Sequence, residues 1–365
     1  MRGLSWRNFD FLLLGAVILA SAFGAMMIRS AIAGNEGLLP LGNRQIYFAL
    51  IGLVVIVLLA SVDYRYWLSL HWLMYIVMMA FLISLSGLGQ AAFGAQRWFQ
   101  VGVLFLQPTE FAKIVLILIL ARYFEKSQND PRDLKWLLKS LLWTWGLVIW
   151  ILLQPNLSNV VVSMVIWGGM VWMNGVDLKQ IALLALVGVL LGLLSFQFLQ
   201  QYQRDRILTF IKPDPNATNG ATYNVRQALI AIGSGELFGK GYGHGTQTQL
   251  RFLKVRHTDF IFSATAEEFG LAGAIVVIAI EAFIIWRCFR AAQKARDVSG
   301  AMIAFGVGIL LFFQGSANIA VNLNLIPVSG LPLPFISYGG SGLMALMLGI
   351  GLVESVAMRH KSMDF

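Results

Sequence analysis

The sequence predicts an all-α polytopic membrane protein with about ten transmembrane helices, forming one integral membrane domain over residues 1–365. Two observations carry this prediction. Hydrophobic residues make up 58% of the chain and charged residues only 12%, whereas a soluble domain carries about a quarter charged residues. Apolar runs close to the ~20 residues of a spanning helix also recur along the chain. Backbone groups in lipid must be satisfied within their own segment, so we expect these runs to be helices.

The first apolar run is the one that has to be distinguished from a signal peptide. It follows Arg2 and Arg7, and residues 20–22 (Ala-Ser-Ala) mimic a cleavage site. Because the run continues to Ile28, we interpret it as a retained span. The ten expected spans cover residues 10–28, 45–61, 70–88, 108–124, 136–153, 158–173, 180–198, 263–286, 301–323 and 340–358.

The distribution of Lys and Arg predicts the orientation. With ten spans, the loops and helix ends on the side of the termini hold fifteen Lys and Arg, against three in the short loops opposite. Positive residues gather on the cytoplasmic side, so we expect both termini in the cytoplasm. The net charge of +9 is then ascribed to topology and not to a nucleic-acid partner.

Residues 199–262 form the only long polar segment, and we expect them to be a large extracytoplasmic loop between the seventh and eighth spans. Long loops cross a membrane largely regardless of charge, so the eight Lys and Arg here do not enter the comparison. Residues 223–232 repeat apolar side chains at helical spacing, which predicts a helix at the outer membrane surface. The glycines within residues 233–245 indicate irregular backbone that wraps closely around another segment or moves.

Glu110 and Lys113 stand three residues apart in the fourth span, so they share one helix face near its outer end. Ionisable groups in a span usually face a cavity or a partner. One interpretation is an ion pair that only holds the bundle together. The other, which we favour, is a polar cavity open to the outside.

Asp259 ends the polar segment, after Lys254, Arg256 and His257 and before three apolar residues. A carboxylate at the edge of a low-dielectric region, with cations nearby, is suited to act as a general base. Spacing alone supports a second interpretation equally well. In that interpretation Thr258 or Asp259 caps the helix that follows.

Cations and a glycine-rich helix start indicate an anionic ligand on the outer face. A lipid diphosphate is the natural partner, although attraction to anionic membrane lipids in general explains the same charges. A rigid Pro-rich loop at residues 327–334 leads into a helix N-terminus that could bind an anion or simply pack tightly. The cations are Arg97, Arg204, Arg206, Lys212, Arg226, Lys254 and Arg256, and the helix start holds Ser337, Gly339, Gly340 and Ser341.

These motifs, in this order, resemble the SEDS family, the shape, elongation, division and sporulation proteins. The similarity covers nearly the whole chain, and the most specific stretch is His-Thr-Asp-Phe-Ile-Phe at residues 257–262, followed by Glu-Glu-Phe-Gly at 267–270. Residues 94–98 and 107–113 are similar to the family's outer loop and fourth helix. Residues 327–335 resemble the elongation branch of the family more than its division branch.

The resemblance implies a bacterial peptidoglycan glycosyltransferase of the cytoplasmic (inner) membrane that polymerises lipid II at the outer face. It implies a class B penicillin-binding protein as partner. It also implies that Asp259 is the essential acid and that Glu110 and Lys113 line a central cavity. One position departs: the family usually has Gln-Pro-Asp after the fifth span, and this chain has Asn156. We therefore leave Asn156 out of the catalytic set.

On this interpretation the reaction inverts the anomeric centre, with Asp259 as base and cations neutralising the diphosphate. A divalent cation, Mg or Mn, is considered only as a companion of the diphosphate, since no Cys/His cluster has metal-ligand spacing. Two alternatives stay open. A flippase for lipid-linked precursors would use the same polar cavity, and a non-catalytic scaffold that activates a penicillin-binding protein would not need Asp259.

Overall fold

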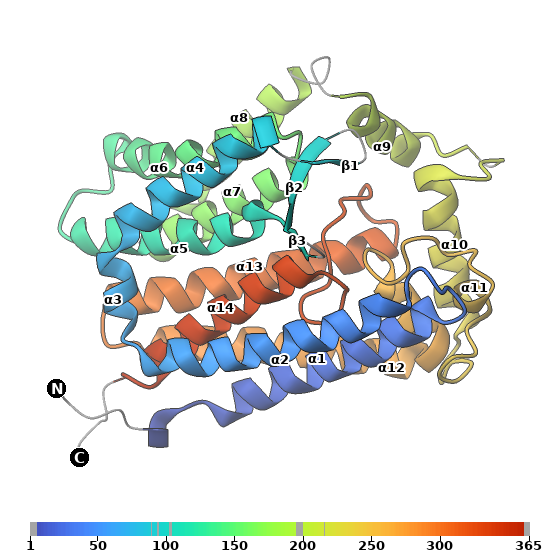
Figure 1. Ribbon diagram of the computed structural model, residues 1–365. Helices are drawn as coiled ribbons and strands as arrows, with labels where there is room; N and C mark the ends of the chain where they lie inside the picture. The colour runs from blue at the N-terminus through green and yellow to red at the C-terminus, as the bar shows by residue number, and fades with distance from the viewer. Residues whose placement is uncertain are drawn as a thin grey trace.

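The structure is a computed structural model that describes residues 6–88, 90–92, 95–101, 104–194, 200–214 and 216–360. Each of the ten expected spans is a helix, and the all-α polytopic fold is confirmed (Figure 1). By length and composition, six of the described helices are apolar enough to cross a membrane: α1, α2, α6, α12, α13 and α14. The ten helices are α1 (Phe11–Ile32), α2 (Leu39–Ser61), α4 (His71–Leu88), α5 (Pro108–Lys126), α6 (Leu134–Leu153), α7 (Leu157–Met173), α8 (Leu178–Leu194), α12 (Ile261–Lys294), α13 (Val298–Asn322) and α14 (Gly340–Ala357).

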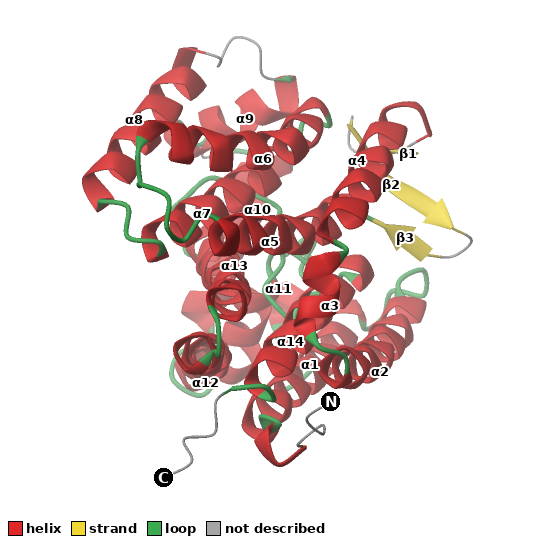
Figure 2. Ribbon diagram, turned by 90° about the vertical axis from the view of Figure 1, so that its left-hand side faces the viewer, coloured by secondary structure: helices red, strands yellow, loops and turns green. Residues whose placement is uncertain are grey.

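The helices form two groups joined by a central set. Seen along the helix axes, α4, α6, α7 and α8 lie apart from α1, α2 and α12 (Figure 2). Helix α13 packs against α7 and α12, one from each group, while α5 packs against α4, α6 and α7, and α14 packs against α2 and α12. The three helices also pack against one another. The hydrophobic side chains of α5 and α14 are buried around most of their circumference, because other helices surround them. These three helices therefore form the core.

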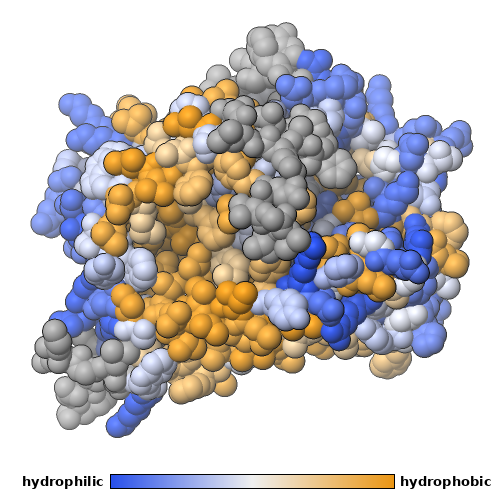
Figure 3. Space-filling model, in the orientation of Figure 1, coloured by the Kyte–Doolittle hydropathy of each residue, from blue (hydrophilic) through white to orange (hydrophobic). Residues whose placement is uncertain are grey.

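The surface divides as a membrane protein requires. Figure 3 shows hydrophobic residues in a broad band across the helices, with hydrophilic residues gathered at the two ends. At one end lie the short 3₁₀ helix η1 (Trp6–Asn8) and the end of α14, and at the other lie α9 to α11 (Figure 1). The chain is thus a multi-pass membrane protein with its two polar surfaces at opposite ends of the bundle.

The polar segment holds more regular structure than expected. The helix predicted at residues 223–232 is present as α10 (Gly220–Ser234), while α9 (Gln201–Ile211) and the single turn α11 (Thr246–Gln249) were not expected. A helix α3 (Tyr64–Ser69) and an antiparallel sheet of order β1-β2-β3 were also not expected. The strands are β1 (Gln90–Ala92), β2 (Ala95–Val101) and β3 (Leu104–Leu106). Strand β2 contains Arg97, whose side chain lies outside the described part of the structure. Residues 195–198, the end of the seventh expected span, also lie outside the described residues.

Helix α12 is broken at Gly270, which has a φ of 67° and a ψ of −164°. The break leaves helical amides and carbonyls without their usual partners. Residues 236–241, from the glycine-rich stretch, supply replacements through four backbone hydrogen bonds. They are Lys240 N to Glu267 O (3.0 Å), Gly241 N to Glu268 O (2.9 Å), Leu271 N to Glu236 O (2.8 Å) and Ala272 N to Leu237 O (3.0 Å).

Glycine is required where the two backbones meet. A Cβ on Gly239 would lie 2.3 Å from Glu268 O, and one on Gly270 would lie 2.4 Å from Gly239 N. Both residues also have positive φ, which disfavours other residues. The expected close wrapping of the glycine stretch around another segment is confirmed, and that segment is α12.

Candidate functional site

Asp259 lies in the turn before α12, and its backbone is held from α13. The carbonyl oxygen of Asp259 accepts hydrogen bonds from the side-chain amides of Asn318 (3.0 Å) and Asn322 (2.9 Å). Both asparagines are buried within α13. The carboxylate of Asp259 takes no part in these bonds and is only partly exposed. The turn is therefore fixed through its main chain, which leaves the side chain available.

The two residues before Asp259 are held from the loop that leads into α14. Ser337 Oγ donates to Thr258 O at 2.6 Å and accepts from Leu333 N at 2.9 Å. Tyr338 N donates to His257 O at 2.9 Å. Three consecutive carbonyls thus bond to groups from α13 and from residues 337–338, and this explains why the 327–341 and 257–262 motifs belong to one site.

The cap interpretation of Thr258 and Asp259 is wrong. The N-cap of α12 is Phe260, and its side chain makes no capping bond. The capping acceptor comes from α13 instead: Asn322 Oδ1 accepts from Ser263 N at 3.0 Å and from Ser263 Oγ at 2.6 Å. Asp259 is therefore not needed to satisfy the helix start.

The environment of Asp259 favours a titration near neutrality. Burial raises the pKa of its carboxyl to about 6, and the guanidinium of Arg206 opposes that rise. Arg206 belongs to α9 and donates to Ser329 O at 3.4 Å. A Cβ built on Gly330 would lie 3.8 Å from Arg206 Nη1 and 3.9 Å from Asp259 Oδ2, so the two side chains face the same small volume. At pH 7 a carboxyl with this pKa is mostly ionised and can accept a proton.

The other expected cations occupy different settings. Arg256 is buried, and its Nε donates to Ala31 O of α1 at 2.5 Å, which makes it a link between segments. Burial lowers the pKa of Arg256 and lowers the pKa of His257 to about 4, so His257 is neutral at pH 7. Lys254 is exposed, with its Nζ 5.9 Å from the ring centroid of Tyr223. Arg256 and Lys254 thus lie in settings of their own, whereas the guanidinium of Arg206 acts on the Asp259 carboxyl.

A cavity of about 260 Å³ begins at Arg206 and extends between α9 and α10. Its lining is largely apolar, with Arg206 and Arg226 as the cations. Val328 of the Pro-rich loop closes one side. A concave apolar space with a few polar groups at its edge is the usual form of a binding site.

Glu110 and Lys113 form a buried ion pair with partners from two other helices. Lys113 Nζ lies 2.8 Å from Glu110 Oε2 and donates to Gln314 Oε1 of α13 at 3.2 Å. Asn159 of α7 donates to Glu110 Oε1 at 3.3 Å. Lys113 is 1% exposed and Glu110 4%, so the pair is enclosed in this structure. Its role in lining a cavity stays a prediction.

The start of α14 packs against both this pair and α2. A Cβ on Gly340 would lie 2.4 Å from the ring of Phe48, and one on Gly342 would lie 3.6 Å from Glu110 Oε2. Gly339 N donates to Gln45 Oε1 at 3.4 Å, and Ser341 is buried. Close packing accounts for Gly340, and anion binding at this helix start stays a prediction.

Glu267 and Glu268 tie α12 to other segments. The carboxylate of Glu267 accepts from Gln247 N (2.8 Å) and Thr248 N (3.1 Å) of α11 and pairs with Lys240 (3.0 Å). Glu268 accepts from Ser30 Oγ of α1. Both acids are fully buried, and these bonds hold α12 to α11 and to α1.

Sequence reasoning missed the polar face of α13. Gln314, Asn318 and Asn322 recur every four residues, which places them on one side of the helix. Three amides at that spacing in an otherwise apolar span were a usable signal. Asn156 also lies near the site as the N-cap of α7, with a buried side-chain nitrogen that has no hydrogen-bond partner.

The part of the chain that the structure describes contains no group of three or more His, Cys, Asp or Glu side chains placed to hold a metal ion. The point at Gly330 that both side chains face has the Arg206 guanidinium and the Asp259 carboxylate within 4 Å, and no second carboxylate. This donor set does not fit a firmly held Mg²⁺ or Mn²⁺.

Comparison with known proteins gives consistent matches over almost the full length. A family model described as "Cell cycle protein", covering FtsW, RodA and SpoVE, matches residues 4–362. The chain is 34% identical over 343 residues to the peptidoglycan glycosyltransferase MrdB of Escherichia coli, covering 94% of this chain and 91% of that protein. It is 35% identical over 361 residues to a probable peptidoglycan glycosyltransferase FtsW of Thioalkalivibrio sp., covering 95% and 89%.

Two solved structures have the same fold. The rod shape determining protein RodA of Thermus thermophilus superposes with a TM-score of 0.73 at 29% identity, covering 98% of this chain and 99% of that one. A chain of a peptidoglycan synthase complex that coordinates polymerization and crosslinking superposes with a TM-score of 0.82 at 28% identity, covering 96% and 98%. The chain therefore belongs to the FtsW, RodA and SpoVE family of cell cycle proteins, the SEDS family that its sequence resembles, and it is RodA-like.

Proposed function

We propose that the chain is a peptidoglycan glycosyltransferase that polymerises lipid II into glycan strands at the outer face of the bacterial cytoplasmic membrane during cell elongation. One observation carries the proposal: the Asp259 carboxyl, with its pKa raised to about 6, faces the Arg206 guanidinium beside a largely apolar cavity. The names of the MrdB and FtsW relatives support the same activity.

In this proposal Asp259 is the general base. It takes the proton from a sugar hydroxyl of the acceptor as that oxygen forms a bond to the anomeric carbon of the donor. The bond between the anomeric carbon and the diphosphate oxygen breaks, and the leaving group departs as a polyprenyl diphosphate. Because the attack is direct, the anomeric centre inverts and no covalent enzyme intermediate forms.

Arg206 stabilises the charge that develops on the leaving diphosphate. A guanidinium matches phosphate oxygens with paired N–H donors, and a low-dielectric setting strengthens the contact. The apolar lining of the cavity between α9 and α10 suits the start of the polyprenyl chain. Lys254, being exposed, and Arg97 are proposed to meet the substrate's outer groups, and the start of α14 to hold a phosphate.

The proposal includes a topology and a partner. Both termini face the cytoplasm and residues 199–262 face outward, as the positive-inside bias indicates. A class B penicillin-binding protein crosslinks the strands that the chain produces. The structural similarity to a chain of a peptidoglycan synthase complex supports such a partner.

The deciding experiment is to incubate the purified chain alone with lipid II and look for glycan strands. Strand formation by the wild-type chain and not by Asp259→Asn is the expected result. Movement of lipid II across vesicle bilayers without strands would favour the flippase. Absence of both activities, with stimulation of an added penicillin-binding protein, would favour the scaffold.

A further inference from the structure

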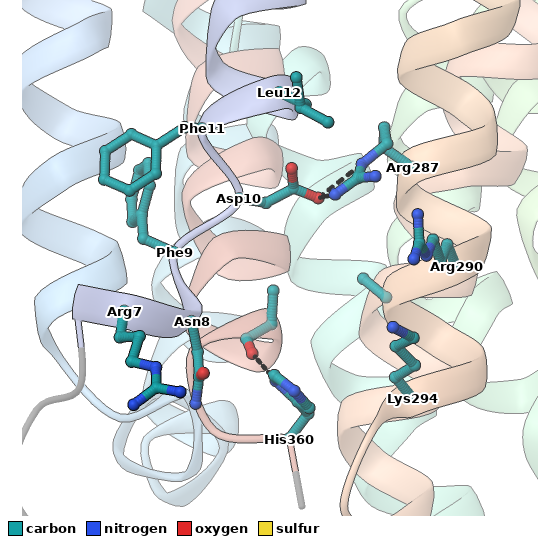
Figure 4. A pocket seen from close by; sticks show the side chains of 12 residues that line it. Arg7, Asn8, Phe9, Asp10, Phe11, Leu12, Arg287, Arg290, Lys294 and His360 are labelled. Carbon is teal, nitrogen blue, oxygen red and sulfur yellow. Dashed lines mark hydrogen bonds and ion pairs between the residues drawn. The ribbon is translucent and has the colours of Figure 1, made fainter. Parts of the chain in front are cut away.

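A second cavity lies at the opposite end of the bundle from Asp259, where α1 begins and the last turns of α12 end. It has a volume of about 350 Å³ (Figure 4). Four cations line it: Arg7 from the 3₁₀ helix η1, and Arg287, Arg290 and Lys294 from α12. Figure 4 shows Arg290 and Lys294 along one wall, across the space from Arg7.

The acid in the lining, Asp10, does not neutralise this cluster. Its Oδ2 accepts from Arg287 Nε at 2.7 Å, and its Oδ1 accepts from Leu13 N at 3.0 Å, which caps α1. Within the described residues, Arg7, Arg290 and Lys294 have no carboxylate in ion-pair contact. Among the residues that the structure describes, three positive charges therefore face one cavity without an acid of their own.

An apolar groove continues from the same cavity. It runs between α1 and α12, begins at Phe11 and Leu12, which line both spaces, and has a volume of about 490 Å³. Gly15 and Ala279 keep it open, one from each helix. A Cβ on Gly15 would meet no atom within 4 Å, so the groove has room for a chain beside that position.

Exposed tryptophans place the cationic cavity at the level of lipid head groups. Trp6 is 45% exposed and Trp286 is 50% exposed. The guanidinium of Arg290 lies 5.4 Å from the ring centroid of Trp286. Amphipathic rings of this kind collect at the boundary between hydrocarbon and water. The groove on α1 and α12 then extends from this boundary into the hydrocarbon.

We propose that this cavity and groove bind one anionic glycerophospholipid of the leaflet on the side of η1. The phosphate lies among Arg7, Arg290 and Lys294, and an acyl chain lies in the groove past Gly15. Charge complementarity selects an anionic head group, and the continuity of the two spaces selects a lipid over a soluble anion. Under the topology proposed above, this leaflet faces the cytoplasm. The lipid bridges α1 and α12.

Native mass spectrometry of the purified full chain tests the proposal. Dioleoylphosphatidylglycerol should bind more tightly than dioleoylphosphatidylcholine, which has the same chains. The double variant Arg290→Gln/Lys294→Gln should bind the anionic lipid roughly thirtyfold more weakly, since each cation near an anionic lipid contributes about fivefold in affinity. Lys135→Gln/Lys139→Gln removes the same charge from exposed positions of α6 and should leave the affinity unchanged.

The groove is tested separately. Gly15→Leu should fill it and weaken binding of the anionic lipid, whereas Gly188→Leu, at an equally open and exposed position of α8, should not. Equal binding of the two lipids, or wild-type affinity in Arg290→Gln/Lys294→Gln, would overturn the proposal. Competition by glycerol 3-phosphate together with wild-type affinity in Gly15→Leu would overturn it in favour of a soluble-anion site.

Discussion

The side-chain amide of Asn322 joins the site to the helix that follows it: Nδ2 donates to Asp259 O at 2.9 Å, while Oδ1 accepts from Ser263 N at 3.0 Å. One buried side chain thus fixes the main chain of the candidate base and caps α12. The carboxylate of Asp259 is needed for neither contact. Substitution of this carboxylate therefore tests its catalytic role without disturbing the turn or the cap.

Asp259→Asn should abolish glycan polymerisation while the chain stays folded in the membrane. The amide keeps the size of the side chain but cannot accept the acceptor's proton, and a general base contributes roughly 10²–10⁴-fold in rate. Strand synthesis from lipid II is the measurement. Asp205→Asn, at an exposed position of α9, is the matched control and should keep its activity. Near wild-type synthesis by Asp259→Asn would show that Asp259 is not the general base.

Asn322→Ala should slow polymerisation by lowering kcat more than it raises KM, because the residue positions Asp259 without touching substrate. It also leaves Ser263 N and one acceptor site of Asp259 O unsatisfied, so the free energy of unfolding should fall by about 1–3 kcal/mol. Asn318→Ala leaves the cap of α12 intact and should destabilise the chain less. Equal loss of stability and activity in both variants would contradict the dual role of Asn322.

Polymerisation should decrease as the pH falls through about 6. The pKa of Asp259 is raised to about 6, so the carboxyl becomes protonated below that pH and the base form is lost. Arg206 holds this pKa down, and Arg206→Gln should move the acid limb of the pH–rate profile to higher pH. Lys254→Gln is the control, because the Lys254 ammonium lies over Tyr223 and should leave the midpoint in place. An unshifted midpoint in Arg206→Gln would show that Arg206 does not lower the pKa of Asp259.

Lys113→Ala should harm the chain more than Glu110→Gln. Removing the cation leaves a buried carboxylate without its ion pair, at a cost of about 3–5 kcal/mol, whereas Gln at position 110 keeps hydrogen-bonding groups toward Asn159. Denaturation in detergent and strand synthesis measure the two consequences. A double variant as stable and active as wild type would show that the pair is neither structural nor catalytic.

Gly220→Cys should react with an impermeant thiol reagent added to intact cells. Gly220 opens α10 in the segment proposed to face outward, and a Cβ there would meet no atom within 4 Å. Cys288 is buried and provides a low background. Labelling only after lysis would invert the proposed topology.

The sequence was sufficient for the spans and insufficient for the contacts between them. Length and hydropathy predict the ten spanning helices because lipid imposes one rule on every span. The same rule conceals the break in α12, because it assigns residues 263–286 to one continuous span. Strands β1 and β3 have only three residues each, and the seven residues of β2 do not alternate between apolar and polar.

The candidate site was predicted in its centre and missed at its edges. Flanking charges made Asp259 a candidate base or a helix cap, and the family resemblance implied the acid, but the face of α13 that fixes its main chain depends on long-range packing. Arg256 shows the same limit: its charge indicated a ligand contact, and the fold uses it to bond Ala31 instead. Charge alone does not show which side of a helix or turn becomes buried.

The break in α12 affects how this helix can enter the membrane during synthesis. Four backbone groups, two on each side of the break, would be open to hydrocarbon if α12 entered the membrane by itself, at several kcal/mol for each unsatisfied group. Residues 236–241, which satisfy these groups, precede α12 in the chain. They are synthesised before Gly270, so the segment that satisfies the break is already part of the chain when the second half of α12 is made.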